Sequence, residues 1–64
     1  MTETAADALR RAAIGIEMKE AREADGRPLD AVELAGFQQD QAAARRHGFT
    51  DADIRARYDQ LSGR

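Results

Sequence analysis

The chain has 64 residues, a formal net charge of −2 at pH 7 and no cysteine. This length allows at most one small domain, and without cysteine neither disulfides nor thiolate metal ligands can stabilise it. A negative net charge opposes general affinity for nucleic acid, which needs clustered Lys and Arg to displace counterions. Aromatic residues make up only 5% of the chain and β-branched residues are few, which opposes a sheet. We therefore expect one all-α domain over residues 1–64.

The sequence also bears on where the protein resides. No apolar run approaches the length that spans a bilayer, and the first residues have neither the basic start nor the apolar core of a signal peptide. We therefore expect a cytoplasmic protein that does not contact membranes. Nine of the ten basic residues are arginine, a bias that is typical of a GC-rich bacterial or phage gene.

The first predicted helix covers residues 4–25. Thr4 with Asp7 three residues later forms a start that resembles a capping box. Gly26 suits the end of the helix, and Pro28 prevents it from resuming.

This helix is apolar on two sides. At 100° per residue, one side carries the expected core stripe, and Ile14, Met18 and Ala21 fall nearly opposite to it. Gly15 in the middle costs about 1 kcal/mol relative to Ala. With Ala8 and Ala12 it forms a strip of small residues that either admits a close neighbour or is merely tolerated. The expected core stripe consists of Ala5, Leu9, Ala12, Ala13 and Ile16.

The second predicted helix covers residues 31–47. Asp30 and Glu33 form a capping box, although Pro28 could instead be the first helical residue. Leu34, Phe37, Gln41 and Ala44 share one face. Gln41 is expected either at the edge of the core or hydrogen-bonded across an interface. Val32, Ala35 and Gln39 point away from this face and form a second candidate surface.

A short corner leads to the third predicted helix, residues 51–61. Gly48 can close the second helix, and Thr50 with Asp53 can cap the third. Phe49 and Ile54 have the spacing of a hydrophobic staple. The core-facing stripe of the third helix is Ile54, Tyr58 and Leu61. Together these elements predict a three-helix mini-domain, with a long helical hairpin and a short third helix.

The corner also has a spacing that resembles the helix-turn-helix families. Ala44 is followed four residues later by Gly48, and then by Phe49, the capping hydroxyl of Thr50 and Ile54. The resemblance covers residues 40–59 and implies a DNA-binding transcriptional regulator that uses the corner and the third helix. The candidate contacts to nucleic acid are Arg45, Arg46, Arg55 and Arg57.

The residues that would face DNA argue against this alternative. Among them, Asp51 and Asp59 would repel phosphate, and only Arg55 is well placed to bind it. Nucleic acid is therefore a possible but disfavoured partner.

We expect no enzymatic activity, no cofactor and no metal site. The single histidine, His47, has no Cys or Ser in a nucleophile context and suits the C-terminal end of the second helix. Asp51 and Asp53 lack the further oxygen ligands and the glycine of a calcium loop.

The second apolar side of the first helix instead favours protein–protein interaction. Ile14 and Met18 form an apolar centre with a charged rim, a pattern common in helical interfaces. Alternatively, the third helix covers this side, so that Ile14 and Met18 meet its core stripe. The favoured hypothesis is a small interaction or regulatory module that acts as a homodimer or bound to a larger protein. The predicted interface consists of Arg10, Arg11, Ile14, Met18 and Ala21.

Overall fold

The computed structural model describes residues 3–63, which form three helices and no strand. They are α1 (Ala5–Ala24), α2 (Ala31–Arg46) and α3 (Asp51–Leu61). The predicted all-α, three-helix fold is confirmed, and each helix begins and ends within one residue of its predicted position. Three residues that were predicted to be helical are instead the caps of their helices: Thr4, Asp25 and His47.

Local capping explains where the helices begin and end. The Thr4 hydroxyl accepts a hydrogen bond from the Asp7 backbone N–H, at 3.1 Å. Capping boxes are complete at Asp30 with Glu33 and at Thr50 with Asp53. Because the first box places the start of α2 at Ala31, the alternative start at Pro28 is wrong. Gly26 and Gly48 follow α1 and α2 at φ angles of 71° and 94°, which favour glycine.

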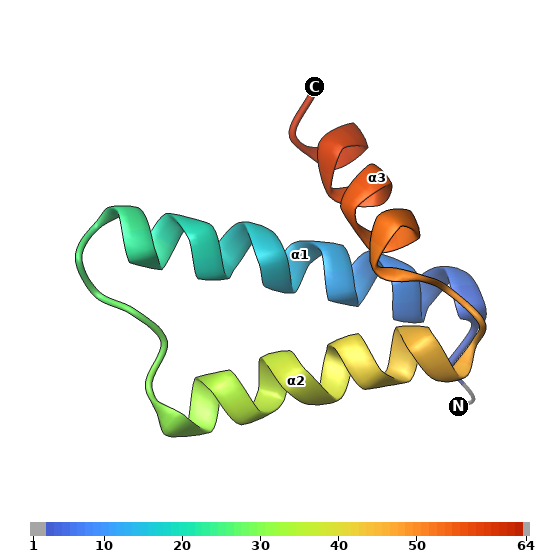
Figure 1. Cartoon of the computed structure of the whole chain (residues 1–64), viewed down its shortest axis with the longest axis horizontal. Coiled ribbons are helices and arrows are strands. Elements are labelled where there is room, and N and C mark those ends of the chain that lie inside the picture. The colour runs from blue at the N-terminus through green and yellow to red at the C-terminus, as the bar shows by residue number, and fades with distance from the viewer. Residues whose placement is uncertain (1–2, 64) are drawn as a thin grey trace.

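The central element of the fold is α1. It lies alongside α2 in an antiparallel hairpin, and α3 packs on α1 and projects away from α2 (Figure 1). No helix of residues 3–63 has the length and apolar character that crossing a membrane requires.

The core is small and rich in alanine. Ala12, Ala44 and Ile54 form its buried centre, one from each helix, and Leu9, Ile16 and Phe49 pack around them. Within residues 3–63, Ile54 is the only large side chain that is fully buried. Ala5, Leu34 and Leu61, which were expected in the core stripes, are exposed. They lie in the terminal turns of their helices, where fewer neighbours surround a side chain.

Small and polar residues bring α1 and α2 together. A Cβ placed on Gly15 would lie 3.2 Å from Phe37 Cδ2, so the Phe37 ring packs directly against the glycine. The Gln41 Nε2 donates a hydrogen bond to the carbonyl oxygen of Ala12 at 2.9 Å. Gln41 therefore bonds between two helices of the same chain, and Gly15 does admit a close neighbour.

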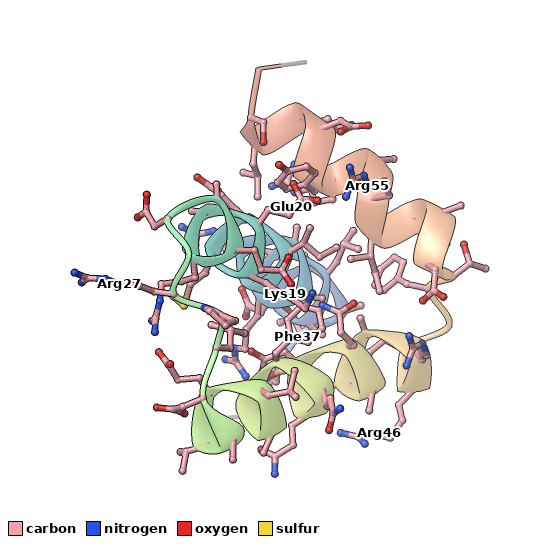
Figure 2. The ribbon with its side chains drawn as sticks, turned by 60° about the vertical axis from the view of Figure 1, so that its left-hand side comes forward. Lys19, Glu20, Arg27, Phe37, Arg46 and Arg55 are labelled. Atoms are coloured by element: carbon pink, nitrogen blue, oxygen red, sulfur yellow. The ribbon has the colours of Figure 1, made fainter. Side chains whose placement is uncertain are left out.

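Charged side chains join α1 to both of its neighbours. The Arg22 guanidinium donates two hydrogen bonds to Glu33, of 2.7 and 3.1 Å, where α1 ends and α2 begins. Glu20 of α1 accepts hydrogen bonds from Arg55 and from the Tyr58 hydroxyl of α3, each at 2.7 Å. Figure 2 shows Glu20 and Arg55 facing one another between these two helices.

Candidate protein-interaction surface

The third helix leaves one side of α1 uncovered. It packs against the side of α1 that carries Leu9 and Ile16, which contact the cluster containing Ile54. Ile14 and Met18 lie on another side and remain 39% and 53% exposed. The alternative in which α3 covers Ile14 and Met18 is therefore wrong. We call Arg10, Arg11, Ile14, Met18 and Ala21 the α1 face; Arg10, Arg11 and Ala21 are exposed as well.

A groove runs between the α1 face and α2. Its volume is about 240 Å³. Two glycines contribute to its lining, one from each helix, and leave it without side chains at those positions. Its apolar lining is Ile14, Gly15, Met18, Leu29, Gly36 and Phe37, and its charged lining is Arg11, Glu33 and Asp40.

A second hollow continues along α1 toward its N-terminus. Its volume is about 300 Å³ and it is lined by Asp7, Arg10, Arg11 and Ile14. The two hollows share Arg11 and Ile14 and so form one continuous surface. Small-molecule sites are concave pockets of roughly 300–1,000 Å³ that enclose most of their ligand. The groove and the adjoining hollow are instead open depressions along α1, which suit individual side chains of a partner.

The charges around the groove differ in how they are paired. Arg11 forms an ion pair with Glu3. Glu33 accepts hydrogen bonds from Arg22, which lower the pKa of its carboxyl group. Partial burial raises the pKa of Asp40, and nearby Arg11 opposes this shift.

Arg10 and Glu17 are charged residues on the exposed side of α1 that have no such partner. Within residues 3–63, neither Arg10 nor Glu17 forms an ion pair or a side-chain hydrogen bond, and both are exposed. They remain available to a partner molecule.

Sequence reasoning missed the contribution of α2 and of the loop before it to this surface. Phe37 was assigned to the core, and Leu29 and Gly36 were given no role in binding. Phe37 instead lies half-buried at the groove, where the Lys19 ammonium stands 5.9 Å from its ring centroid (Figure 2). The one available signal was Gly15 within a helix, which marks a place where a side chain would approach a neighbouring ring.

The second candidate surface, on α2, is exposed as expected. Val32 is 82% exposed, and Ala35 and Gln39 are exposed too. None of the three lines the groove or the adjoining hollow. Among these three residues, Val32 is the only large apolar side chain.

The arginines of the DNA-binding alternative are mostly engaged within the chain. Arg45 pairs with Asp51 at 2.9 Å, and Arg57 donates to the Gln60 side chain at 3.0 Å. Arg55 pairs with Glu20 and lies over the Tyr58 ring, 4.8 Å from its centroid. Arg46 lies on the side of α2 that faces away from α3 (Figure 2).

Three of these four guanidinium groups are therefore engaged by side chains of the same chain, and Arg46 faces away from α3. The sequence did not reveal this arrangement, because Glu20 lies 35 positions away from Arg55.

The single histidine contributes to helix termination. His47 is the exposed C-cap of α2, and its backbone N–H donates to the carbonyl oxygens of Ala43 and Ala44. Within residues 3–63, no three His, Asp or Glu side chains are grouped so that they could hold a metal ion.

Comparison with known proteins does not assign this surface to a family. A scan against protein-family models and searches of curated proteins and of solved structures found no match to the chain.

Proposed function

We propose that this protein is a small protein-interaction module that binds through the α1 face and the groove beside it. The observation that carries the proposal is that the apolar side chains of Ile14 and Met18 stay exposed although α2 and α3 both pack on α1. Apolar centres with charged rims are typical of helical interfaces, and methionine adapts readily to a partner's shape.

The shape of the surface supports a protein partner over a small ligand. The groove is open and continues into a second hollow along α1, whereas small-molecule pockets enclose most of their ligand. An amphipathic helix that lies along α1 contacts both hollows at once, since such helices bind grooves through side chains one turn apart.

The composition of the core gives a further argument. Within residues 3–63, the buried apolar residues are Ile54, Tyr58 and four alanines, which remove a limited apolar area from water, whereas Ile14 and Met18 remain exposed. Covering the α1 face with a partner adds the burial that a chain of this size lacks.

The test is co-purification with matched variants. Tagged wild-type protein and tagged Met18→Asp are each co-expressed with an untagged copy of the chain and also exposed to a cell lysate. Val32→Asp is the control, because it places the same charge on an exposed apolar residue outside the groove. Circular dichroism establishes that all three proteins are helical.

We expect the wild type and Val32→Asp to retain a protein, either the untagged copy or one from the lysate, and Met18→Asp to lose it. If no protein is retained in a manner that depends on Met18, the proposal is wrong. If Met18→Asp is unfolded while Val32→Asp is folded, Met18 belongs to the core and the proposal is also wrong.

A further inference from the structure

The charges of the α1 face are arranged with a symmetry about Ile14. Arg10 and Arg11 precede Ile14 by four and three residues, and Met18 and Glu17 follow it by four and three residues. Asp7 precedes it by seven residues, and Ala21 follows it by seven. The N-terminal half of this side therefore carries the arginines, and the C-terminal half carries a carboxylate and the exposed methionine.

We propose that the occupant of this surface is a second copy of the same chain, bound so that the two α1 helices run antiparallel about a two-fold axis at Ile14. This inference rests on the proposed function, since it names the partner of the same surface. In a two-fold dimer the same patch is used on both copies, so the patch must complement itself.

The antiparallel arrangement makes the patch self-complementary. It places each residue before Ile14 opposite the residue that follows Ile14 by the same number of positions. Met18 of one copy then lies at the level of Arg10 of the other, on the edge of the face that carries Arg11, at the hollow lined by Asp7, Arg10, Arg11 and Ile14. The aliphatic stems of the two arginines cover the thioether, because arginine buries its methylenes while its charged end stays in water.

The same arrangement pairs Arg10 with Glu17, which are both unpaired within residues 3–63. Arg10 and Glu17 are seven residues apart, so they lie within about 20° of one another around the helix. In an antiparallel pair of helices related by a two-fold axis, the edge of the α1 face that carries Arg10 and Glu17 meets the same edge of the other copy. Arg10 of each copy therefore meets Glu17 of the other, and the dimer contains this ion pair twice.

The extent of the contact suits a dimer of a chain this small. With 20 residues, α1 is about 30 Å long. This length is close to the longest dimension of the molecule, 33 Å. An antiparallel contact along α1 therefore covers Ile14 and Met18 of both copies, which are among the largest exposed apolar side chains.

The test is the solution mass by sedimentation equilibrium over a dilution series into the low micromolar range. We expect the wild type to have twice the 7.0 kDa mass of the chain. Met18→Asp should raise the dissociation constant at least about 30-fold, the change that defines an interface hot spot. Val32→Asp should leave the dissociation constant unchanged.

A charge exchange tests the antiparallel geometry without touching the apolar centre. Glu17→Arg alone and Arg10→Glu alone should each weaken the dimer, because like charges then face one another. The double variant that carries both changes should restore association, since the ion pair is formed with its signs exchanged. Both positions are exposed and unpaired within residues 3–63, so these variants should keep the helical signal of the wild type.

The outcomes separate this inference from the proposed function. A wild-type monomer at every concentration overturns the dimer, and the proposed function then stands only if a protein from the lysate is retained through Met18. The assignment of this interface is overturned if Val32→Asp dissociates the dimer. It is also overturned if neither Met18→Asp nor the single charge reversals change the mass of the dimer. If Glu17→Arg and Arg10→Glu each weaken the dimer but the double variant does not restore it, the antiparallel pairing is overturned.

Discussion

Two glycines within helices differ in what surrounds them. Gly15 of α1 lies against the Phe37 ring, and a Cβ there would approach Cδ2 to 3.2 Å. Gly36 of α2 lines the groove, and a Cβ there would meet nothing within 4 Å. Both positions lose helix propensity relative to alanine, but only Gly15 is required for packing.

Alanine substitution at the two glycines should therefore give different results. Gly36→Ala should raise the free energy of unfolding by about 1 kcal/mol, because alanine favours the helix and fills open space. Gly15→Ala should gain less or destabilise the protein, because the Phe37 ring must move. Urea unfolding followed by circular dichroism at one protein concentration measures both. Equal gains would mean that Phe37 is not held against Gly15.

Glu33 has two roles at the start of α2. Its carboxylate accepts hydrogen bonds from the Asp30 backbone N–H in the capping box and from the Arg22 guanidinium. Hydrogen bonding by Arg22 is the larger cause that lowers the pKa of Glu33 in the folded protein. The ionised form is therefore favoured in the folded state more than in the unfolded state.

Stability should consequently depend on the charge of Glu33 in acid. Its contribution is complete above the ordinary glutamate pKa of 4.5 and is lost as the pH falls through the lowered folded-state pKa. Asp40 acts in the opposite direction, because burial raises its pKa. Glu33→Gln keeps a capping amide but carries no charge.

We expect the melting-temperature difference between wild type and Glu33→Gln to shrink as the pH is lowered from neutral to below the ordinary glutamate pKa. Thermal unfolding of both proteins across that range checks this, and the contribution of Asp40 cancels in the difference. A difference that is constant with pH would contradict the role of the Arg22–Glu33 pair.

At the scale of the helices, two different kinds of contact hold α2 and α3 to α1. The contact between α1 and α2 depends on small residues and on the buried hydrogen bond from Gln41 to Ala12. The contact between α1 and α3 depends on Ile54, which is 1% exposed, and on the bonds of Arg55 and Tyr58 to Glu20. The hairpin is therefore sensitive to the chemistry of one amide.

Changing that amide to a carboxylate should disrupt the hairpin. Gln41→Glu should lower the free energy of unfolding by about 2–3 kcal/mol near neutral pH, because a buried carboxylate would face the Ala12 carbonyl without a donor hydrogen. Stability should recover in acid, where the protonated carboxyl can donate.

Gln38→Glu is the matched control, since it makes the same change at an exposed position of α2. Urea unfolding at neutral and acidic pH checks the prediction. Equal effects of the two variants would show that the hydrogen bond to Ala12 does not hold the hairpin.

At the scale of the whole molecule, several large apolar side chains lie outside the core. Among residues 3–63, the large apolar side chains that remain exposed are Ile14, Met18, Val32, Leu34 and Leu61. A domain of this size buries a limited fraction of its surface, so each apolar side chain left outside is a substantial loss. Association through the α1 face recovers part of that loss.

Association should make thermal stability depend on protein concentration. A hundredfold rise in concentration stabilises a dimer by about 2.7 kcal/mol, which corresponds to a rise of about 5–10 °C in melting temperature for chains of this size. We expect this rise in the wild type and none in Met18→Asp. Differential scanning calorimetry across a concentration series checks it, and a constant wild-type melting temperature would contradict self-association.

The helices and their bounds could be predicted from the sequence because the interactions that determine them are local. Capping by Thr4, Asp30 and Thr50 joins residues three positions apart, and glycine at positions 26 and 48 is a property of one residue. The predicted site residues Ile14 and Met18 likewise followed from the periodicity of α1 alone. A helix's own pattern shows which sides are apolar.

Which neighbour covers each side was decided only by the tertiary structure. The sequence left open whether α3 would pack on the side of Ile14 or on that of Leu9, since both are apolar. The choice depends on contacts between residues far apart in the chain, including the bonds of Glu20 to Arg55 and Tyr58. The groove has the same origin, because it exists only where Gly15 and Phe37 of two different helices meet.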